Sequence, residues 1–92
     1  PQGPPSIMSF YVYMIKTINR HPAKTYVGYT NNIELRLIAH NSNKGAKNTK
    51  GYKWILIYKK KFKNKSEAMS FEYTLKKDRK QRISILKSNQ QL

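Results

Sequence analysis

The stretch from Thr25 to Asn41, TYVGYTNNIELRLIAHN, decides the fold, because it predicts a short strand, a sharp turn and an amphipathic helix in direct succession. Its first residues are strand formers interrupted by a single glycine. Asn31 can cap the helix, and Glu34 three positions later completes the spacing of a capping box. Gly28 leaves the backbone open where the strand approaches the helix, so we expect a ligand to come close to the chain there.

Two pairs of residues on this predicted helix recur one turn apart. Ile33 and Leu37 form an apolar stripe that would face the core. Arg36 and His40 have the same spacing and lie beside that stripe. In one interpretation they are ordinary surface side chains, as most charged residues are. In the other, a cation and an imidazole project from the rim of the buried face toward a bound molecule.

The composition excludes several classes of protein. Ninety-two residues suffice for one domain with a modest core. The sequence has no cysteine, so disulfide frameworks and cysteine-based zinc sites are excluded. It contains no apolar run of about 18 residues that would span a membrane, and no signal-peptide pattern precedes the first strand. We therefore expect an intracellular protein, in the nucleus or cytoplasm, without membrane attachment.

The charge predicts a polyanionic partner. Nineteen lysines and arginines stand against four acidic residues, which gives a net charge of +15 at pH 7. Nucleic acid is the first candidate partner and an anionic membrane surface the second. Because the apolar stripes are needed for the core, a membrane-binding helix is the weaker interpretation. Binding to DNA would be driven by counter-ion release and would weaken steeply with salt.

Three strands are predicted. The first, Phe10–Ile18, is apolar on both faces and is expected at the centre of the sheet. A short polar loop joins it to the strand that begins at Thr25, so these two strands should be antiparallel. The third, Trp54–Phe62, ends in three lysines, Lys59 to Lys61, which suit either an exposed sheet edge or a contact with DNA.

A second helix is predicted from a cap at Ser66 to about Lys77. Its apolar stripe contains Ala68, Phe71 and Leu75. Glu72 lies on the same face, where a carboxylate is costly unless it is paired or bound to a cation. Two interpretations stay open at this point. Glu72 either pairs with Arg36 or a lysine, or it binds a metal ion.

The ends of the chain are assigned from composition. Residues 1–7, PQGPPSI, are typical of a disordered leader and are left out of the predicted domain. A short third helix is expected around Gln81–Lys87. The single domain should therefore cover residues 8–88, followed by a frayed tail at 89–92.

The segment 41–53 has no apolar period and is predicted to be a flexible basic loop. Its lysines recur at every third position, at Lys44, Lys47, Lys50 and Lys53. The loop is either a solubilising linker or an arm that contacts DNA phosphates, with Tyr52 and Trp54 available for stacking on bases. The total charge favours the arm.

Taken together, these residues resemble the GIY-YIG nuclease domain. The tripeptide YVY at 11–13 stands where that family has Gly-Ile-Tyr, and YVG at 26–28 where it has Tyr-Ile-Gly. Arg36 follows Gly28 at the family's spacing, with His40 one turn later. Glu72 stands where the family has its metal-binding glutamate. The resemblance covers residues 10–77, nearly the whole expected domain.

Within that family the chain is most similar to the Slx1-type structure-selective endonucleases and small stand-alone relatives. Three features differ from the pattern. The first motif begins with Tyr11 instead of glycine, the cysteine-rich RING-type domain that docks a scaffold partner is missing, and no residue matches an asparagine that some members carry after the second helix.

The resemblance implies a role for each site residue. Glu72 would hold one Mg²⁺ or Mn²⁺, which suits a single carboxylate with waters and substrate oxygens. Arg36 would bind the phosphate being cleaved. Tyr13 or Tyr26 would activate the attacking water, and we favour Tyr13 as the base with Tyr26 positioning phosphate or water. Because a free tyrosine has a pKa of about 10, nearby cations, helped by His40, would have to assist.

The resemblance also implies the fold and the substrate. The fold would be α+β, a small and mainly antiparallel sheet of three strands flanked by two or three helices. The substrate would be duplex, branched or flap DNA, as in repair and recombination, with an unknown scaffold protein as a further partner. Two other functions stay open: a basic module that binds DNA or RNA without cutting it, and a structural protein of a ribonucleoprotein particle.

Overall fold

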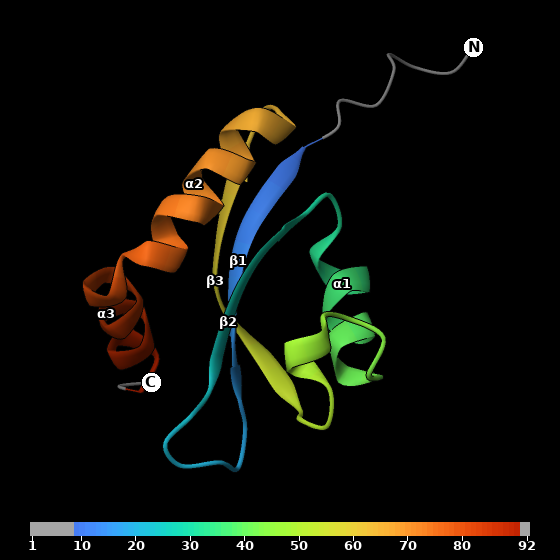
Figure 1. Ribbon diagram of the computed structural model, residues 1–92, viewed down its shortest axis with the longest axis vertical. Helices are drawn as coiled ribbons and strands as arrows, with labels where there is room; N and C mark the ends of the chain where they lie inside the picture. The colour runs from blue at the N-terminus through green and yellow to red at the C-terminus, as the bar shows by residue number, and fades with distance from the viewer. Residues whose placement is uncertain (1–8, 91–92) are drawn as a thin grey trace.

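The computed structural model describes residues 9–90, so the predicted leader at 1–7 and the last two residues of the predicted tail lie outside the described part. The elements follow one another in this order: β1 (Phe10–Thr17), β2 (Thr25–Thr30), α1 (Ile33–Asn41), the 3₁₀ helix η1 (Lys47–Thr49), β3 (Trp54–Phe62), α2 (Lys65–Lys77) and α3 (Arg79–Gln90) (Figure 1). Within the described residues, no helix is long and apolar enough to cross a membrane.

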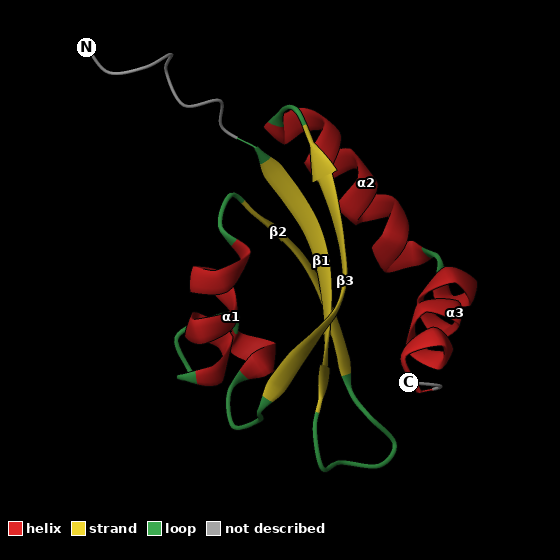
Figure 2. Cartoon of the chain, turned by 180° about the vertical axis from the view of Figure 1, so that it is seen from behind, coloured by secondary structure: helices red, strands yellow, loops and turns green. Residues whose placement is uncertain are grey.

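The strands form one antiparallel sheet in the order β2-β1-β3, with β1 at the centre. The α2 and α3 helices cover one face of this sheet, and α1 with η1 covers the other (Figure 1); Figure 2 shows the same layers from behind. The predicted α+β fold with a small three-stranded sheet is therefore confirmed. Because β3 lies at an edge, its lysines are in the exposed edge position that the sequence suggested.

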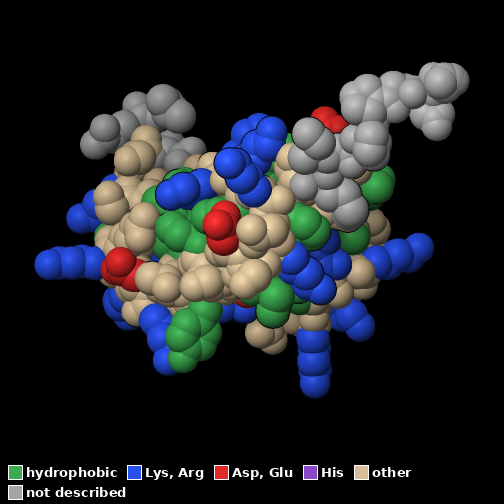
Figure 3. Space-filling view, turned by 90° about the horizontal axis from the view of Figure 1, so that it is seen from above, with side chains coloured by type: hydrophobic (Ala, Val, Ile, Leu, Met, Phe, Trp, Pro, Cys, Tyr) green, Lys and Arg blue, Asp and Glu red, His purple; other side chains and the backbone are tan. Residues whose placement is uncertain are grey.

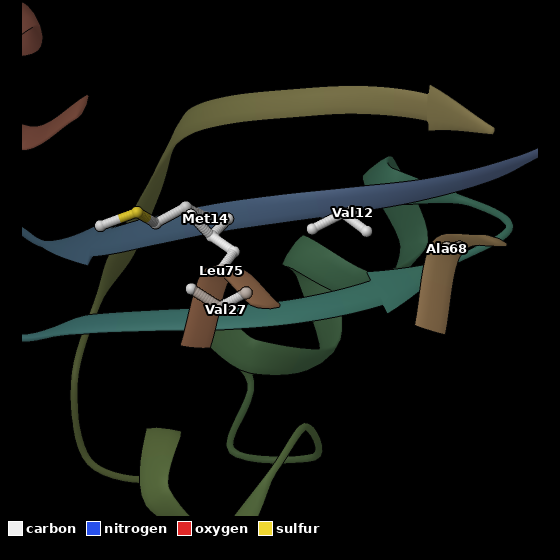
Figure 4. Close-up of a cluster of buried hydrophobic side chains, with 5 residues drawn as sticks. All are labelled: Val12, Met14, Val27, Ala68 and Leu75. Carbon is white, nitrogen blue, oxygen red and sulfur yellow. The ribbon is translucent and has the colours of Figure 1, made fainter. Parts of the chain in front are cut away.

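Each face of the central strand contributes to a separate core. Alternate residues of β1 point in opposite directions, as in any strand. The core beneath α2 and α3 contains Val12, Met14, Val27, Ala68 and Leu75 (Figure 4). The core beneath α1 contains Tyr13, Ile15 and Trp54, with the predicted apolar stripe of Ile33 and Leu37 packed against it. The prediction that the first strand is covered on both sides is confirmed.

The helix starts differ from the predicted ones. The cap of α1 is Asn32 and not Asn31, because the Asn32 side chain accepts a hydrogen bond from the Leu35 N–H at 3.1 Å. The cap of α2 is Asn64 and not Ser66, with its side chain accepting from the Glu67 N–H at 2.9 Å. In both cases the asparagine has extended backbone, which a capping residue requires.

The third helix is longer than predicted. Asp78 accepts a hydrogen bond from the Gln81 N–H at 3.0 Å, so the helical turn begins at Arg79, two positions before the predicted start. The helix continues to Gln90, which places residues 89 and 90 in a helix instead of a frayed tail.

Candidate active site

Three aromatic rings from three elements meet on the α1 face of the sheet. Tyr13 comes from β1, Tyr26 from β2 and His40 from the last turn of α1. The ring centroids of the two tyrosines lie 6.4 Å apart, and the His40 ring lies 5.8 Å from Tyr13 and 5.1 Å from Tyr26. The fold therefore brings together three of the five residues that the sequence singled out for chemistry.

Gly28 has a different role from the predicted one. We expected the open backbone there to admit a ligand, but the phenol ring of Tyr13 fills that space. The two residues face each other across the β1–β2 ladder, so any side chain at position 28 would collide with the ring. The glycine is needed for the placement of a protein side chain, and Tyr13 owes its position over β2 to it.

A chain of hydrogen bonds runs inward from Tyr13. The Tyr13 hydroxyl lies 2.7 Å from Nε2 of His40, and Nδ1 of His40 lies 2.9 Å from the hydroxyl of Thr49. The Thr49 hydroxyl donates in turn to the carbonyl oxygen of Ala46 at 2.8 Å. His40 has an exposed fraction of 0%, so its interpretation as an ordinary surface side chain is wrong.

The surroundings keep both members of this pair uncharged at neutral pH. Burial raises the pKa of Tyr13 to about 12, although the hydrogen bond and the charge of Arg36 work in the opposite direction. Burial, followed by the charge of Arg36, lowers the pKa of His40 to about 4. We expected nearby cations to bring the phenol's pKa down, but in the free protein burial outweighs Arg36.

Arg36 links the two tyrosines to an open hollow. The hydrogen bond with Tyr13 is the largest cause of a raised pKa of Arg36, and Tyr26 contributes as well. The half-buried guanidinium also lines a hollow of about 580 Å³ that it shares with Asn31 and Lys65. Because Arg36 affects the pKa of Tyr13 and also lines this open space, its forked donors are placed to hold an anion near Tyr13.

Glu72 lies on α2 and approaches the rings from the other face of the sheet. Its side chain is 17% exposed and lies 3.5 Å from Nζ of Lys76, one turn later, so the predicted pairing with a lysine is present. Its negative charge makes a small contribution to the raised pKa of Tyr13, well behind that of burial. Lys76 in turn lines a hollow of about 230 Å³ with Tyr26 and Asn48, at the exposed edge of β2.

A metal ion at Glu72 would need ligands from outside the protein. Among the described residues, no three His, Cys, Asp or Glu side chains gather in a way that could hold a metal ion. A half-buried carboxylate at an open edge still fits Mg²⁺, a hard cation that keeps several waters and takes phosphate oxygens as ligands. Lys76 does not block this use, because its half-exposed side chain can turn to solvent.

The segment between α1 and β3, predicted as a flexible basic loop, contains the 3₁₀ helix η1 and is held by hydrogen bonds. Asn41 joins its two ends: the Asn41 side chain accepts from the Trp54 N–H at 2.6 Å and donates to the Trp54 carbonyl at 3.1 Å. The Trp54 indole donates to the Thr49 carbonyl at 3.0 Å. Trp54 is buried, so it cannot stack on a base. The prediction that it is available for stacking is wrong.

Three small or polar residues of this segment contact or support the site and were given no role from the sequence: Asn41, Gly45 and Thr49. Gly45 lies so close to His40 that a Cβ atom there would overlap Nδ1 of the ring. Thr49 is the only residue of η1 that is buried. Thr49 stands among lysines and asparagines, so no hydrophobic period in the sequence predicts its burial. Its role becomes visible only in the contact with His40.

The lysines of the loop are exposed, as an arm that contacts phosphates requires. The side chain of one of them, Lys53, is partly engaged, since its Nζ donates to the Asn41 carbonyl at 3.0 Å. Tyr52 is half-buried, with Lys24 and Arg20 over its ring at 4.6 Å and 5.4 Å. On the face seen in Figure 3, Lys and Arg side chains project around the periphery, and acidic side chains form only small spots.

Comparison with known proteins identifies the family of the chain. The family model described as the GIY-YIG catalytic domain matches residues 9–84. A UPF0213 protein of Staphylococcus haemolyticus is 41% identical over 78 residues, which cover 83% of this chain and 92% of the relative. A UPF0213 protein of Oceanobacillus iheyensis is 48% identical over 67 residues, covering 72% and 74% of the two chains.

A solved structure is also similar in sequence. The solution NMR structure of a UPF0213 protein from Bacillus halodurans is 34% identical, covers 87% of this chain and 86% of its own, and superposes with a TM-score of 0.46. The names of these relatives state no substrate.

Proposed function

Because the chain belongs to the GIY-YIG catalytic domain family, we propose that it is a divalent-metal-dependent endonuclease that hydrolyses phosphodiester bonds in DNA. The observation that carries the proposal is the pair formed by Tyr13 and His40. A phenol whose proton points at a buried, neutral imidazole can take a proton from water and pass its own on.

The Tyr13 hydroxyl works in this proposal as a relay and not as a stored anion. With its pKa raised to about 12, Tyr13 holds its proton in the free protein. As the attacking water forms its bond to phosphorus, the Tyr13 oxygen takes the proton of that water and its own proton passes to Nε2 of His40. The P–O bond to the leaving 3′-oxygen breaks, that oxygen takes a proton from solvent to become the 3′-hydroxyl, and the imidazolium releases its proton to solvent.

Substrate binding would make His40 a better acceptor. In the free protein the charge of Arg36 contributes to the low pKa of His40. A phosphate bound to Arg36 neutralises that charge, so the pKa of His40 moves back toward its usual range when DNA is present. Arg36 would thus hold the phosphate, stabilise the charge of the transition state and prime the relay. Tyr26, whose ring contacts His40, would position the phosphate or the water.

Glu72 is the residue that would hold the metal ion. When bound, Mg²⁺ or Mn²⁺ would neutralise charge on the phosphate and on the leaving oxygen. The small contribution of the Glu72 charge to the raised pKa of Tyr13 supports a place for this carboxylate near the reacting phosphate. The ion pair with Lys76, at 3.5 Å, shows that the carboxylate of Glu72 lies within reach of a cation.

The finer proposal concerns the substrate. The charge of +15 supplies affinity for the DNA backbone without reading a sequence. We therefore expect selection by DNA shape, with branched or flap structures preferred over plain duplex, in a repair or recombination role. The exposed Lys44, Lys47 and Lys50 lie in the segment that also supplies Thr49, so the backbone contacts would adjoin the chemistry.

A cleavage assay with a matched variant tests the proposed function. Supercoiled duplex, flap and four-way-junction DNA are each incubated with Mg²⁺, with Mn²⁺ or with a chelator. We expect metal-dependent nicking by the wild type, lowered by on the order of a hundredfold or more in Tyr13→Phe, which keeps the ring over Gly28 and removes only the hydroxyl. If the wild type binds all three DNAs and cuts none, the protein is instead a non-catalytic binding module.

A further inference from the structure

The hydroxyl of Thr49 is placed where it can decide which nitrogen of His40 carries the proton. We infer that Thr49 is a positioning residue that holds His40 in the tautomer with its proton on Nδ1, leaving Nε2 to accept from Tyr13. This inference deepens the proposed function, because the relay needs an acceptor at Nε2. The tautomer itself, however, exists in the free protein and can be measured there.

The assignment follows from the single hydrogen of the Thr49 hydroxyl. The Ala46 carbonyl, 2.8 Å away, can only accept, so it takes that hydrogen. The lone pairs of the Thr49 oxygen then face Nδ1 of His40 at 2.9 Å, and Nδ1 must be the donor. A neutral imidazole has one N–H, so Nε2 is left as an acceptor 2.7 Å from the Tyr13 oxygen.

The opposite tautomer of His40 would leave the Ala46 carbonyl with one hydrogen bond fewer. With the proton on Nε2, His40 would donate to Tyr13, and the Thr49 hydroxyl would have to turn away from Ala46 to reach Nδ1. The Ala46 carbonyl would keep only the bond from the Thr49 backbone N–H at 3.0 Å. As the bonds stand, no buried side-chain nitrogen or oxygen atom among the described residues lacks a partner.

The loop gives the Thr49 hydroxyl little freedom to move. Thr49 has an exposed fraction of 0%, and its carbonyl oxygen accepts from the indole of Trp54 at 3.0 Å. Gly45 packs against the imidazole near the same Nδ1 so closely that it leaves no room for a side chain. One short segment thus supplies both the hydroxyl that contacts Nδ1 of His40 and the glycine that packs against the ring beside it.

Nuclear magnetic resonance of the labelled ring nitrogens tests the inference directly. The chain has two histidines, and the exposed His21 serves as an internal reference whose signals are identified with His21→Gln. In the free wild type at neutral pH, we expect His40 to carry its proton on Nδ1 and a bare Nε2. A proton found on Nε2 in the wild type would overturn the inference, whatever the variants do.

Two substitutions at position 49 separate the hydroxyl from the shape of the side chain. Thr49→Val keeps the shape and removes the hydroxyl, and Thr49→Ser keeps the hydroxyl. We expect the serine variant to retain the wild-type tautomer and the valine variant to shift the proton wholly or partly to Nε2. An unchanged tautomer in the valine variant would remove Thr49 from this role. If the valine variant fails to fold, the wild-type and serine spectra still decide the assignment.

Cleavage rates then show whether the tautomer matters for chemistry. Under single-turnover conditions we expect Thr49→Val to lower the rate by about tenfold or more, with DNA affinity unchanged and Thr49→Ser close to wild type. Equal rates for wild type and the valine variant would overturn the positioning role. If the wild type shows the Nδ1 tautomer but does not cut DNA, the proposed function fails and the structural assignment of Thr49 stands.

Discussion

The ring of Tyr13 lies against the backbone of Gly28: a Cβ atom at position 28 would stand 2.5 Å from the Tyr13 hydroxyl oxygen and 2.7 Å from Cζ. The two residues are directly opposed across the β1–β2 ladder. The glycine of the second motif and the tyrosine of the first are thus a single packing unit. This pairing explains in steric terms why the two short motifs occur together.

Gly28→Ala should therefore destabilise the fold through Tyr13. We expect a loss of about 1–3 kcal/mol in the free energy of unfolding, typical of overpacking in a core. Denaturant unfolding of Gly28→Ala, Tyr13→Ala and the double variant measures the coupling. Because the small side chain at position 13 removes the collision, the double variant should be more stable than the sum of the single losses predicts. Strict additivity would contradict the direct packing of the two residues.

Arg36→Ala should reduce turnover much more than DNA affinity. Many cations share the binding, but one guanidinium would meet the reacting phosphate, so we expect a loss on the order of a hundredfold or more in single-turnover rate at saturating DNA. Arg36→Lys should restore little, because an ammonium lacks the forked donors. The pKa values of His40 and Tyr13 should both rise in Arg36→Ala. A variant with weaker binding and a normal rate would show that Arg36 is not catalytic.

Glu72→Gln should abolish cleavage and leave the fold intact. The carboxylate is paired only with a half-exposed lysine one turn away, so its loss should change the free energy of unfolding by about 0.5 kcal/mol or less. DNA binding should be as tight as in the wild type or tighter, since a negative charge is removed. Glu67→Gln is the matched control, because Glu67 is an exposed glutamate in the first turn of the same helix. A folded Glu72→Gln protein that cuts DNA at the wild-type rate would show that Glu72 does not hold a catalytic metal ion.

The loop lysines should set the salt dependence of DNA binding. Replacing Lys44, Lys47 and Lys50 by alanine should flatten the slope of log affinity against log salt by roughly 0.9 for each phosphate of duplex DNA that the protein no longer neutralises. The same change of charge on β3, with alanine at Lys59, Lys60 and Lys61, is the control for a general effect of net charge. If both triple variants change the slope equally, the loop has no special place in the interface.

Acid should destabilise the protein through His40. The pKa of His40 is lowered from 6.5 to about 4 by burial and by Arg36. Between pH 6.5 and 4 the unfolded chain binds a proton at His40 that the folded chain does not bind. The contribution of neutral His40 to the free energy of unfolding is therefore complete above about pH 6.5 and is lost as the pH falls toward 4. The full effect is on the order of 3 kcal/mol. Denaturant curves across this range should fall more steeply for wild type than for His40→Gln, and parallel curves would count against the buried neutral imidazole.

The elements with regular periods could be predicted from the sequence. The continuous apolar run in Phe10–Thr17 reflects burial of both faces of the strand, and the one-turn spacing of Ile33 and Leu37 reflects burial of one face of the helix. The bounds predicted for the third strand are the observed ones for the same reason. Helix caps were missed by one or two positions, because several consecutive polar residues can cap a helix and the final backbone path selects among them.

The candidate site was only partly predictable. Tyr13, Tyr26, Arg36, His40 and Glu72 could be singled out because they recur in a known pattern, but their catalytic roles stay predictions. The segment that orients His40 was taken for a flexible loop, because Gly45 and Thr49 act through contacts with a residue on another element. The direction of the pKa shift of Tyr13 was also missed, since burial becomes known only once the sheet and α1 are packed together.

The two hydrogen bonds between the Asn41 side chain and the backbone of Trp54 have a consequence for how this protein can diversify. They fasten the beginning and end of the loop to each other, so the strand that follows keeps its register whatever the loop carries outward. The inward residues, Gly45 and Thr49, serve the imidazole, while Lys44, Lys47 and Lys50 face solvent. The outward residues of the loop can therefore change, in evolution or by design, while the inward residues that contact His40 stay the same.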